Sequence, residues 1–235
     1  MKKLVVSDFD GTFYRNEEEI VKNIEAVKKF KEKGNLFLIA TGRSYDDFEK
    51  MNQMFRIPCD YLILNNGATI LNREKQVLYT FYIDEKIKNK VVDDLDLEQN
   101  TDIDFYFCCS GLESRVSPRH EKLTKIAIYY KDHIDVSKIR DDLVNCYGDD
   151  LTVTLGTNHN IEIAGRNTSK ATAIQYLLKH MNLSKDHVYV IGDSDNDAKM
   201  IQEFHGNCVE NASDQIKQIS SGVYISFTDY LETIS

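Results

Sequence analysis

Short apolar runs alternate with longer amphipathic stretches along the first third of the chain. Residues 2–7, 35–40 and 61–64 are predicted strands, because each is a short, mostly apolar run that ends in polar residues. Residues 17–33 are a predicted helix with its apolar positions on one face, and a second helix is predicted to begin at Ser44. This βαβαβ order predicts a parallel sheet that is covered by helices and connected by right-handed crossovers.

The same alternation returns near the C-terminus. Residues 168–181 and 196–204 are predicted helices, and residues 188–191 between them are a predicted strand. Residues 208–209 and 223–225 are predicted edge strands with a short helix between them. We expect these elements to resume the parallel sheet that the N-terminal segment begins.

The middle of the chain follows a different order. It is predicted to contain helices and strands in the order αββαββ, at residues 84–97, 102–109, 123–130, 136–147, 151–155 and 161–164. That order is typical of an open antiparallel sheet with helices on one face. We therefore predict an inserted α+β domain over residues 83–164 and a parallel-sheet α/β core formed by residues 1–82 and 165–235.

Composition and charge narrow the class of protein. With 235 residues, of which 42% are hydrophobic and 29% charged, the chain has the make-up of a globular protein of one large or two modest domains. Its formal net charge of −9 argues against a nucleic-acid partner, which normally binds a basic face. An anionic substrate would meet an unfavourable overall field, so its site should contain local cations.

Cysteines and apolar runs bear on the cellular compartment. The five cysteines are an odd number without a CxxC pair or a Cys/His ligand spacing, which favours reduced thiols over a disulfide framework or a zinc site. The apolar stretch after Lys2 and Lys3 is too short for a signal peptide, and no run approaches the length of a membrane span. We expect a soluble cytoplasmic protein, monomeric or weakly homo-oligomeric, that does not bind membranes.

Two carboxylates follow the first predicted strand. Asp8 and Asp10 would repel each other and lose solvation there, and a divalent cation such as Mg²⁺ would offset this cost. Three other polar clusters follow strands or open a helix, namely residues 41–42 (Thr-Gly), Lys170 and residues 192–197 (Gly-Asp-Ser-Asp-Asn-Asp). Ligands of a parallel sheet bind just past the carboxyl ends of its strands, so the clusters together predict one site. An ordinary polar turn would explain any one of the loops alone.

The acidic run near the C-terminus has a competing interpretation as a calcium loop of the EF-hand kind. Such a loop needs glycine at its sixth position and glutamate at its twelfth. Counted from Asp193, these positions hold Ala198 and Phe204, so this interpretation fails. A solvated acidic turn stays possible for residues 193–197.

With these motifs, the chain resembles the haloacid dehalogenase superfamily, specifically the Cof-like hydrolases with an inserted cap of the C2 type. Residues 8–12 (Asp-Phe-Asp-Gly-Thr) are similar to the family's first motif, and residues 40–43 (Ala-Thr-Gly-Arg) to its second. Lys170 falls where the family keeps a lysine, and residues 192–197 look like its acidic fourth motif. The resemblance covers essentially the whole chain and implies a Rossmann-like core with a mobile α+β cap.

The resemblance implies an Mg²⁺-dependent phosphatase that acts on a small phosphorylated metabolite, with sugar phosphates first among the candidates. Asp8 would be the nucleophile that forms an aspartyl-phosphate, and Asp10 would be the general acid and base. Asp8, the backbone carbonyl of Asp10, and Asp193 would hold the Mg²⁺. Asp197 would orient Lys170 or the waters of the metal.

The residues implied to bind phosphate or other parts of the substrate come from several loops. They are Phe9, Thr41, Gly42, Asn66, Lys170 and Asn196. A lysine on a helix is usually a solvated charge, but Lys170 lies in the first turn, where the helix dipole disfavours a cation, which favours a functional role. Asn66 could equally belong to an ordinary Asn-Gly turn. Weaker candidates for substrate recognition in the middle segment are Arg115, Arg119, His120 and His159.

Three alternative functions differ in what they require of the site. A phosphomutase would use the same Asp8 and Asp10, but it would keep a phosphorylated enzyme and return the group to a sugar. A phosphate-responsive binding protein without turnover would not need both a nucleophile and an acid. A dehalogenase would have no use for Asp10 or for the metal ligands. The phosphomutase is therefore the nearest alternative.

Overall fold

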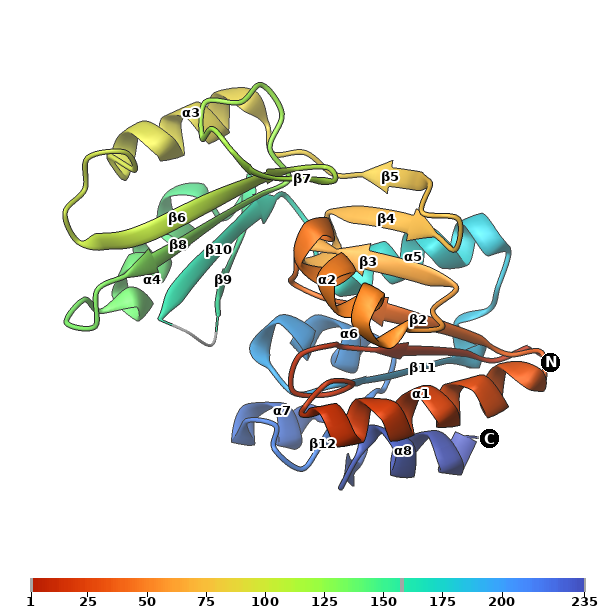
Figure 1. Cartoon of the computed structure of the whole chain (residues 1–235). Coiled ribbons are helices and arrows are strands. Elements are labelled where there is room, and N and C mark those ends of the chain that lie inside the picture. The colour runs from red at the N-terminus through yellow and green to blue at the C-terminus, as the bar shows by residue number, and fades with distance from the viewer. Residues whose placement is uncertain (1, 157–158, 235) are drawn as a thin grey trace.

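The computed structural model of the chain describes residues 2–156 and 159–234. The described strands form two separate sheets, one of eight strands and one of five (Figure 1). The larger sheet is built from both ends of the chain and the smaller sheet from its middle.

The larger sheet is mostly parallel. Its order is β13-β12-β11-β1-β2-β3-β4-β5, in which the first six strands run parallel and β4 and β5 are antiparallel additions at one edge. In chain order the strands are β1 (Leu4–Ser7), β2 (Leu36–Ala40), β3 (Tyr61–Leu64), β4 (Thr69–Asn72), β5 (Val77–Thr80), β11 (Val188–Gly192), β12 (Asn207–Val209) and β13 (Val223–Tyr224). The predicted α/β class with a parallel core sheet is confirmed.

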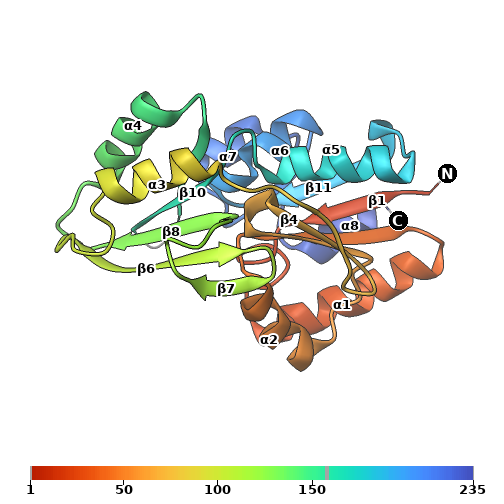
Figure 2. The same cartoon turned by 90° about the horizontal axis from the view of Figure 1, so that it is seen from above.

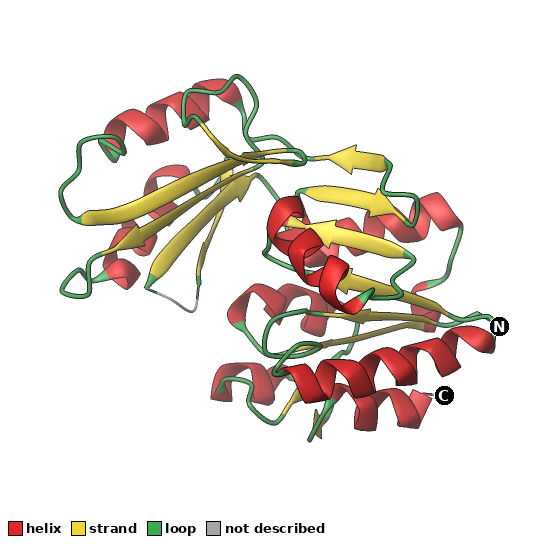
Figure 3. Ribbon diagram, viewed as in Figure 1, coloured by secondary structure: helices red, strands yellow, loops and turns green. Residues whose placement is uncertain are grey.

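Helices cover both faces of this sheet, as Figures 2 and 3 show. Val5 of β1 belongs to the apolar cluster formed with α1, α2 and α8, whereas Leu4 and Val6 belong to the cluster formed with α5, α6 and α7. The helices are α1 (Glu17–Glu32), α2 (Tyr45–Phe55), α8 (Phe227–Ile234), α5 (Lys170–Met181), α6 (Ala198–Glu203) and α7 (Asp214–Ile219). A parallel strand that is buried on both faces is expected to be nearly continuously apolar, and β1 has Leu4, Val5 and Val6 before the buried Ser7 that ends it.

The smaller sheet is antiparallel throughout, in the order β7-β6-β8-β10-β9. Its elements are α3 (Glu85–Asp94), β6 (Ile103–Ser110), β7 (Glu113–Val116), β8 (Lys125–Tyr130), α4 (Val136–Tyr147), β9 (Leu151–Leu155) and β10 (Asn160–Gly165). The two helices lie on the same side of the sheet (Figure 2), where Val91 and Leu143 pack with Ile126, Ile128 and other strand residues. The opposite face is left free to meet the core.

Four elements were not expected from the sequence: β4, β5, β7 and α8. The prediction for the middle segment was therefore incomplete, since its described order is αβββαββ rather than αββαββ. Strand β7 reads Glu-Ser-Arg-Val at the edge of its sheet, and β5 alternates between exposed and half-buried residues, so neither carries a buried apolar run. The limits of the inserted domain, residues 83–164, stay a prediction.

Two further observations concern the chain as a whole. Within the described ranges, none of the helices combines the length and the apolar character that crossing a membrane requires. All five cysteines are free, and Cys108, Cys109 and Cys208 are buried. Burial raises the pKa of Cys108 to about 12 and that of Cys109 to about 11, which keeps these thiols protonated and unreactive.

Candidate active site

Asp8 lies directly after β1, at the carboxyl edge of the larger sheet. Its backbone N–H donates to the carbonyl of Ile191 in β11 at 3.0 Å, and its side chain is buried. Oδ1 accepts a hydrogen bond from Lys170 Nζ at 2.5 Å, whereas Oδ2 is buried without a hydrogen-bond partner among the described residues. An unpaired buried carboxylate oxygen is costly, so this atom marks the place where a ligand is expected.

Lys170 is the first residue of α5, and its side chain is completely buried. Besides Asp8, its Nζ contacts Asp197 Oδ1 at 2.7 Å. Burial alone would lower the pKa of this lysine, but the carboxylates of Asp197 and Asp8 outweigh burial and raise the pKa above its ordinary value. Lys170 is therefore a fixed positive charge beside Asp8.

Asp197 is fully buried and organises the loop that follows β11. Its Oδ1 faces Lys170, and its Oδ2 accepts hydrogen bonds from the backbone N–H groups of Asp193 at 3.0 Å and Ser194 at 3.2 Å. Gly192 is required just before this loop, because a Cβ there would lie 2.5 Å from the Asp197 carboxyl carbon. With both oxygens engaged, Asp197 orients Lys170 and the loop after β11.

The carboxylates of this group carry more negative charge than Lys170 can neutralise. Oxygen atoms of Asp8, Asp193 and Asp197 all lie within 4.8 Å of one another. Burial raises the pKa of Asp8 well above its ordinary value, and the two neighbouring aspartates add to this against the opposing effect of Lys170. Burial and Asp197 likewise raise the pKa of Asp193 to about 6, although the Thr12 hydroxyl donates to Asp193 Oδ1 at 2.9 Å.

This donor set fits a Mg²⁺ ion. Mg²⁺ prefers hard oxygen ligands and is usually held by one or two carboxylates. Asp8 Oδ2 lacks a partner among the described residues, and the Asp193 carboxylate lies beside it at the mouth of the same group. Excess negative charge at these two residues is the condition that a divalent cation relieves.

Asp10 is more exposed than Asp8, with 51% of its side-chain surface accessible. Arg43 holds it from two sides, with Nε at 2.8 Å from Oδ2 and Nη2 at 2.7 Å from Oδ1. The same guanidinium lies over the Phe9 ring, 5.1 Å from its centroid. The Phe9 ring is buried in the core of the larger sheet, so only its backbone could contact a substrate.

The loop after β2 brings Thr41 and Gly42 to the same edge of the sheet. Thr41 is buried, and its Oγ1 accepts a hydrogen bond from the Arg43 N–H at 3.1 Å. Gly42 has no room for a side chain, because a Cβ would lie 2.8 Å from Asn66 Oδ1. That same Asn66 oxygen accepts a hydrogen bond from Asn196 Nδ2 at 3.2 Å. The structure thus brings together four of the residues that the sequence marked for phosphate or substrate binding.

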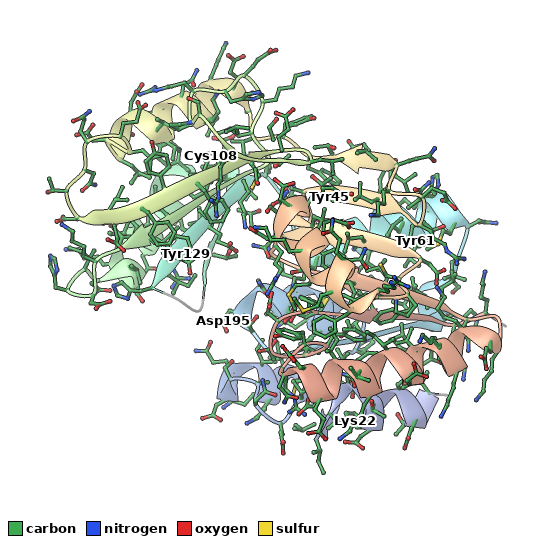
Figure 4. All side chains as sticks on the ribbon, viewed as in Figure 1. Lys22, Tyr45, Tyr61, Cys108, Tyr129 and Asp195 are labelled. Atoms are coloured by element: carbon green, nitrogen blue, oxygen red, sulfur yellow. The ribbon has the colours of Figure 1, made fainter. Side chains whose placement is uncertain are left out.

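A cavity of about 1000 Å³ opens between the two sheets beside these groups. From the larger sheet it is lined by residues that include Asp8, Asp10, Gly42, Asp193 and Asn196, and from the smaller sheet by Phe107, Lys125, Tyr129, Asn160 and Glu162. Figure 4 shows the labelled Tyr129 on the smaller sheet and Asp195 on the part of the core that it faces. The candidate nucleophile therefore shares one space with the open face of the antiparallel sheet.

Lys125 and Glu162 are among the lining residues to which sequence interpretation gave no role. They form an ion pair at 2.9 Å in which the lysine side chain is only 2% exposed. The signal was the alternation along β8, in which Ile126 and Ile128 face the helices while Lys125 and Tyr129 face the cavity.

The weaker candidates for substrate recognition in the middle segment lie outside the lining of this cavity. Of the described residues that line the cavity, none is Arg115, Arg119, His120 or His159. Arg119 pairs instead with Asp93 at 2.7 Å and with Glu98 at 3.3 Å on the surface. The structure gives no reason to assign these four residues to the site.

Comparison with known proteins supplies an independent view of the chain. A family model described as haloacid dehalogenase-like hydrolase matches residues 5–112 and 110–229. The chain is 26% identical to 5-amino-6-(5-phospho-D-ribitylamino)uracil phosphatase YcsE of Bacillus subtilis over 97% of this chain and 90% of that protein. It is 22% identical to phosphatase YwpJ of the same organism over 95% of each.

The fold also matches a solved structure. A Plasmodium vivax protein described as HAD/COF-like superposes with a TM-score of 0.84 and 22% identity, over 99% of this chain and 94% of that one. At this level of identity the likeness concerns the fold, including the separate antiparallel sheet.

Proposed function

The chain belongs to the haloacid dehalogenase-like hydrolases, and from that premise we propose that it is an Mg²⁺-dependent phosphatase of a small phosphorylated metabolite. The observation that carries the proposal is the state of the Asp8 carboxylate. Lys170 holds one of its oxygens, and the other is buried and unpaired among the described residues, beside the cavity. A carboxylate in this state is a suitable nucleophile for a phosphate ester. Two relatives also bear the name phosphatase.

In the first half of the reaction, the Asp8 carboxylate would attack phosphorus while the bond to the leaving oxygen breaks, which gives an aspartyl-phosphate. Lys170, fixed by Asp197, would neutralise charge on the phosphate oxygens. Asp8, the backbone carbonyl of Asp10, and Asp193 would hold the Mg²⁺, which supplies the positive charge that an anionic nucleophile needs near an anionic phosphate.

Asp10 would give its proton to the leaving oxygen and later take one from the water that hydrolyses the aspartyl-phosphate. Its contact with Arg43 keeps the carboxylate in one orientation, and this contact must open when a substrate oxygen takes its place. The Thr41 hydroxyl, the Gly42 amide and the Asn196 side chain would donate hydrogen bonds to the phosphate.

The cavity favours a small substrate. Its volume of about 1000 Å³ and its mixed polar and aromatic lining suit a phosphorylated metabolite, with sugar phosphates first among the candidates. Against the overall charge of −9, Arg43 and Lys170 supply the local cations that an anionic ester needs.

A screen of phosphorylated metabolites for Mg²⁺-dependent release of phosphate tests this proposal. The set should contain sugar phosphates and a phosphorylated ribityl compound, because one relative is named for such a substrate. We expect turnover of at least one ester, abolished by EDTA and restored by Mg²⁺. Activity that persists without metal would contradict the assigned ligands.

The nucleophile is tested by Asp8→Asn, which keeps the size of the side chain. We expect turnover to fall by more than about a thousandfold, because the aspartyl-phosphate can no longer form. Circular dichroism and the melting temperature should report a folded variant. Substantial residual turnover would exclude the aspartyl-phosphate route.

A further inference from the structure

We propose that Lys125 and Glu162 are positioning residues for phosphoryl transfer: they join the antiparallel sheet to the two core loops that would hold the phosphate. The inference rests on the proposed function and adds to it the residues through which the position of the antiparallel sheet acts on the chemistry. Two chains of contacts lead from this ion pair to the core loops.

Lys125 is the first residue of β8, and its ammonium group is removed from water. Its side chain is 2% exposed, and its Nζ lies 2.7 Å from the backbone carbonyl of Gly42 and 2.9 Å from Glu162 Oε1. The ring of Phe107 lies 5.1 Å from the same nitrogen. Burial by itself would lower the pKa of Lys125, but Glu162 more than offsets burial, so the group stays charged. A buried charge is costly unless it is fully paired. One of the partners of Lys125, the Gly42 carbonyl, belongs to the loop after β2 in the larger sheet.

The Gly42 carbonyl connects this lysine to the expected phosphate ligands. It belongs to the same rigid peptide unit as the N–H of Arg43, and that N–H donates to Thr41 Oγ1 at 3.1 Å. Lys125 thus holds one edge of the peptide plane and Thr41 holds the other. Because Thr41 Oγ1 accepts a hydrogen bond here, its own proton is free to point to a phosphate oxygen.

The side chain that follows this peptide reaches the proposed acid and base. Arg43 grips Asp10 through both of its carboxylate oxygens at 2.7–2.8 Å. A change in the orientation of the Gly42–Arg43 peptide therefore moves Thr41 and Asp10 together.

Glu162 extends the arrangement to a second loop. Its Oε1 pairs with Lys125, and its Oε2 accepts a hydrogen bond from Asn66 Nδ2. The Oδ1 of Asn66 in turn accepts from Asn196 Nδ2 at 3.2 Å, in the loop that carries Asp193. One carboxylate of the antiparallel sheet is thereby connected, through Lys125 and Asn66, to both groups of expected phosphate ligands.

Two of these contacts run between the two sheets, Lys125 with the Gly42 carbonyl and Glu162 with Asn66, so they exist only while the sheets are held together as described. If the antiparallel sheet swings away, Gly42 loses the donor on its carbonyl and Asn66 loses its acceptor. The phosphate-binding loops are then fixed from one side only. Positioning errors of this kind lower the rate of the chemical step more than they lower the affinity for substrate.

Hydrogen exchange of the free protein tests the link without any turnover. Lys125→Met removes the ammonium group and keeps much of the side-chain volume. Lys131→Met, an exposed lysine just past the end of the same strand, is the matched control. We expect amides of residues 41–44 to exchange roughly tenfold faster in the Lys125 variant and at the wild-type rate in the control. Unchanged exchange in the Lys125 variant would overturn the proposal.

Steady-state kinetics on two esters with unrelated leaving groups then separate positioning from direct contact with substrate. For a positioning role, Lys125→Met lowers kcat by about ten- to a hundredfold on both esters and leaves KM within about threefold. A rise in KM confined to one ester would show that Lys125 binds that leaving group, and this outcome would overturn the proposal.

Glu162→Gln is a second test of the ion pair, which stays available if Lys125→Met does not fold. The amide keeps an oxygen for Asn66 and removes the charge that faces Lys125, so we expect the same changes at smaller size. The double variant should be no worse than Lys125→Met alone, because the two residues act as one unit. If the losses of kcat in the two single variants simply add in the double variant, Lys125 and Glu162 act independently, which would contradict the proposal. If wild type hydrolyses no ester, the proposed function fails, while the exchange experiment still decides whether Lys125 fixes the loop.

Discussion

At the scale of single residues, the raised pKa of Asp193 is the clearest indication that a cation binds at the candidate site. Burial and the neighbouring Asp197 raise its pKa from 3.8 to about 6. For an acid, a folded-state pKa above the unfolded value means that the folded protein binds the proton more tightly. This contribution to stability is complete below pH 3.8 and is lost as the pH rises through about 6.

A metal ion bound at Asp8 and Asp193 would take the place of that proton. We therefore expect millimolar Mg²⁺ to raise the melting temperature clearly at about pH 8 and only slightly at about pH 5, where protons compete for the same oxygens. Thermal unfolding with and without Mg²⁺ at each pH measures this. In Asp193→Asn the stabilisation by Mg²⁺ should be small at both values. Equal stabilisation of the wild type at both pH values would contradict the assignment.

How far the site could be predicted depends on the type of contact. The convergence of Asp8 and Asp193 follows from a general rule, because both follow parallel strands, and these end at one edge of the sheet. The grip of Arg43 on Asp10 has no such signal, since it depends on how a long side chain crosses from one loop to the next. Contacts of this second kind become visible only when side-chain directions are known.

At the scale of elements, the strands that position the site are those with the strongest sequence signal. All residues of β1 and β2 except Ser7 are apolar, because helices cover these strands on both faces. Edge strands such as β7 bury little and so leave little trace in the sequence. The last helix, α8, does carry a signal, since its buried residues Phe227, Tyr230, Leu231 and Ile234 recur at helical spacing. That signal was overlooked.

The loop after β2 contains a glycine whose replacement by a larger residue would displace the side chain of Asn66. A Cβ at position 42 would lie 2.8 Å from Asn66 Oδ1, so Gly42→Ala should push Asn66 away from Asn196. We expect kcat to fall by about tenfold or more and stability to fall by roughly 1–3 kcal/mol, as for other overpacked sites. Urea unfolding and phosphate release measure the two effects.

A second substitution separates the steric effect from the loss of ligands. Asn66 has a left-handed backbone with φ of 57°, which glycine tolerates, so Gly42→Ala combined with Asn66→Gly should regain much of the stability. It should not regain activity, because the amide that contacts Asn196 is gone. Wild-type kcat in Gly42→Ala would show that the loop has room to spare.

At the scale of the whole molecule, the two sheets divide the lining of one cavity. The larger sheet supplies the carboxylates and the phosphate loops, and the antiparallel sheet supplies Phe107, Lys125, Tyr129, Asn160 and Glu162. Sequence patterns predicted both sheets, since each has its own periodicity. They could not predict which face of the smaller sheet meets the core, because that depends on side-chain packing between distant segments.

This division predicts where substrate preference lies. If residues 83–164 are exchanged for the matching segment of a relative, with Lys125 and Glu162 kept, the preferred ester should change while dependence on Asp8 and Mg²⁺ persists. The screen of phosphorylated metabolites, applied to the parent proteins and the chimera, measures this. An unchanged preference would assign specificity to the core.

The pairing of β1 with β11 also bears on how the protein is made. Leu4 lies opposite Val188, and the lysine that partners Asp8 follows it by 162 positions. Since a ribosome delivers the N-terminus first, β1 can pair early with β2, but its second neighbour, β11, does not exist until residue 192 has been made. A chain that has been made only as far as β10 therefore contains Asp8 and Asp10 but neither Lys170 nor Asp193. We therefore expect the candidate site to be complete only after β11 and the loop that carries Asp193 have been made.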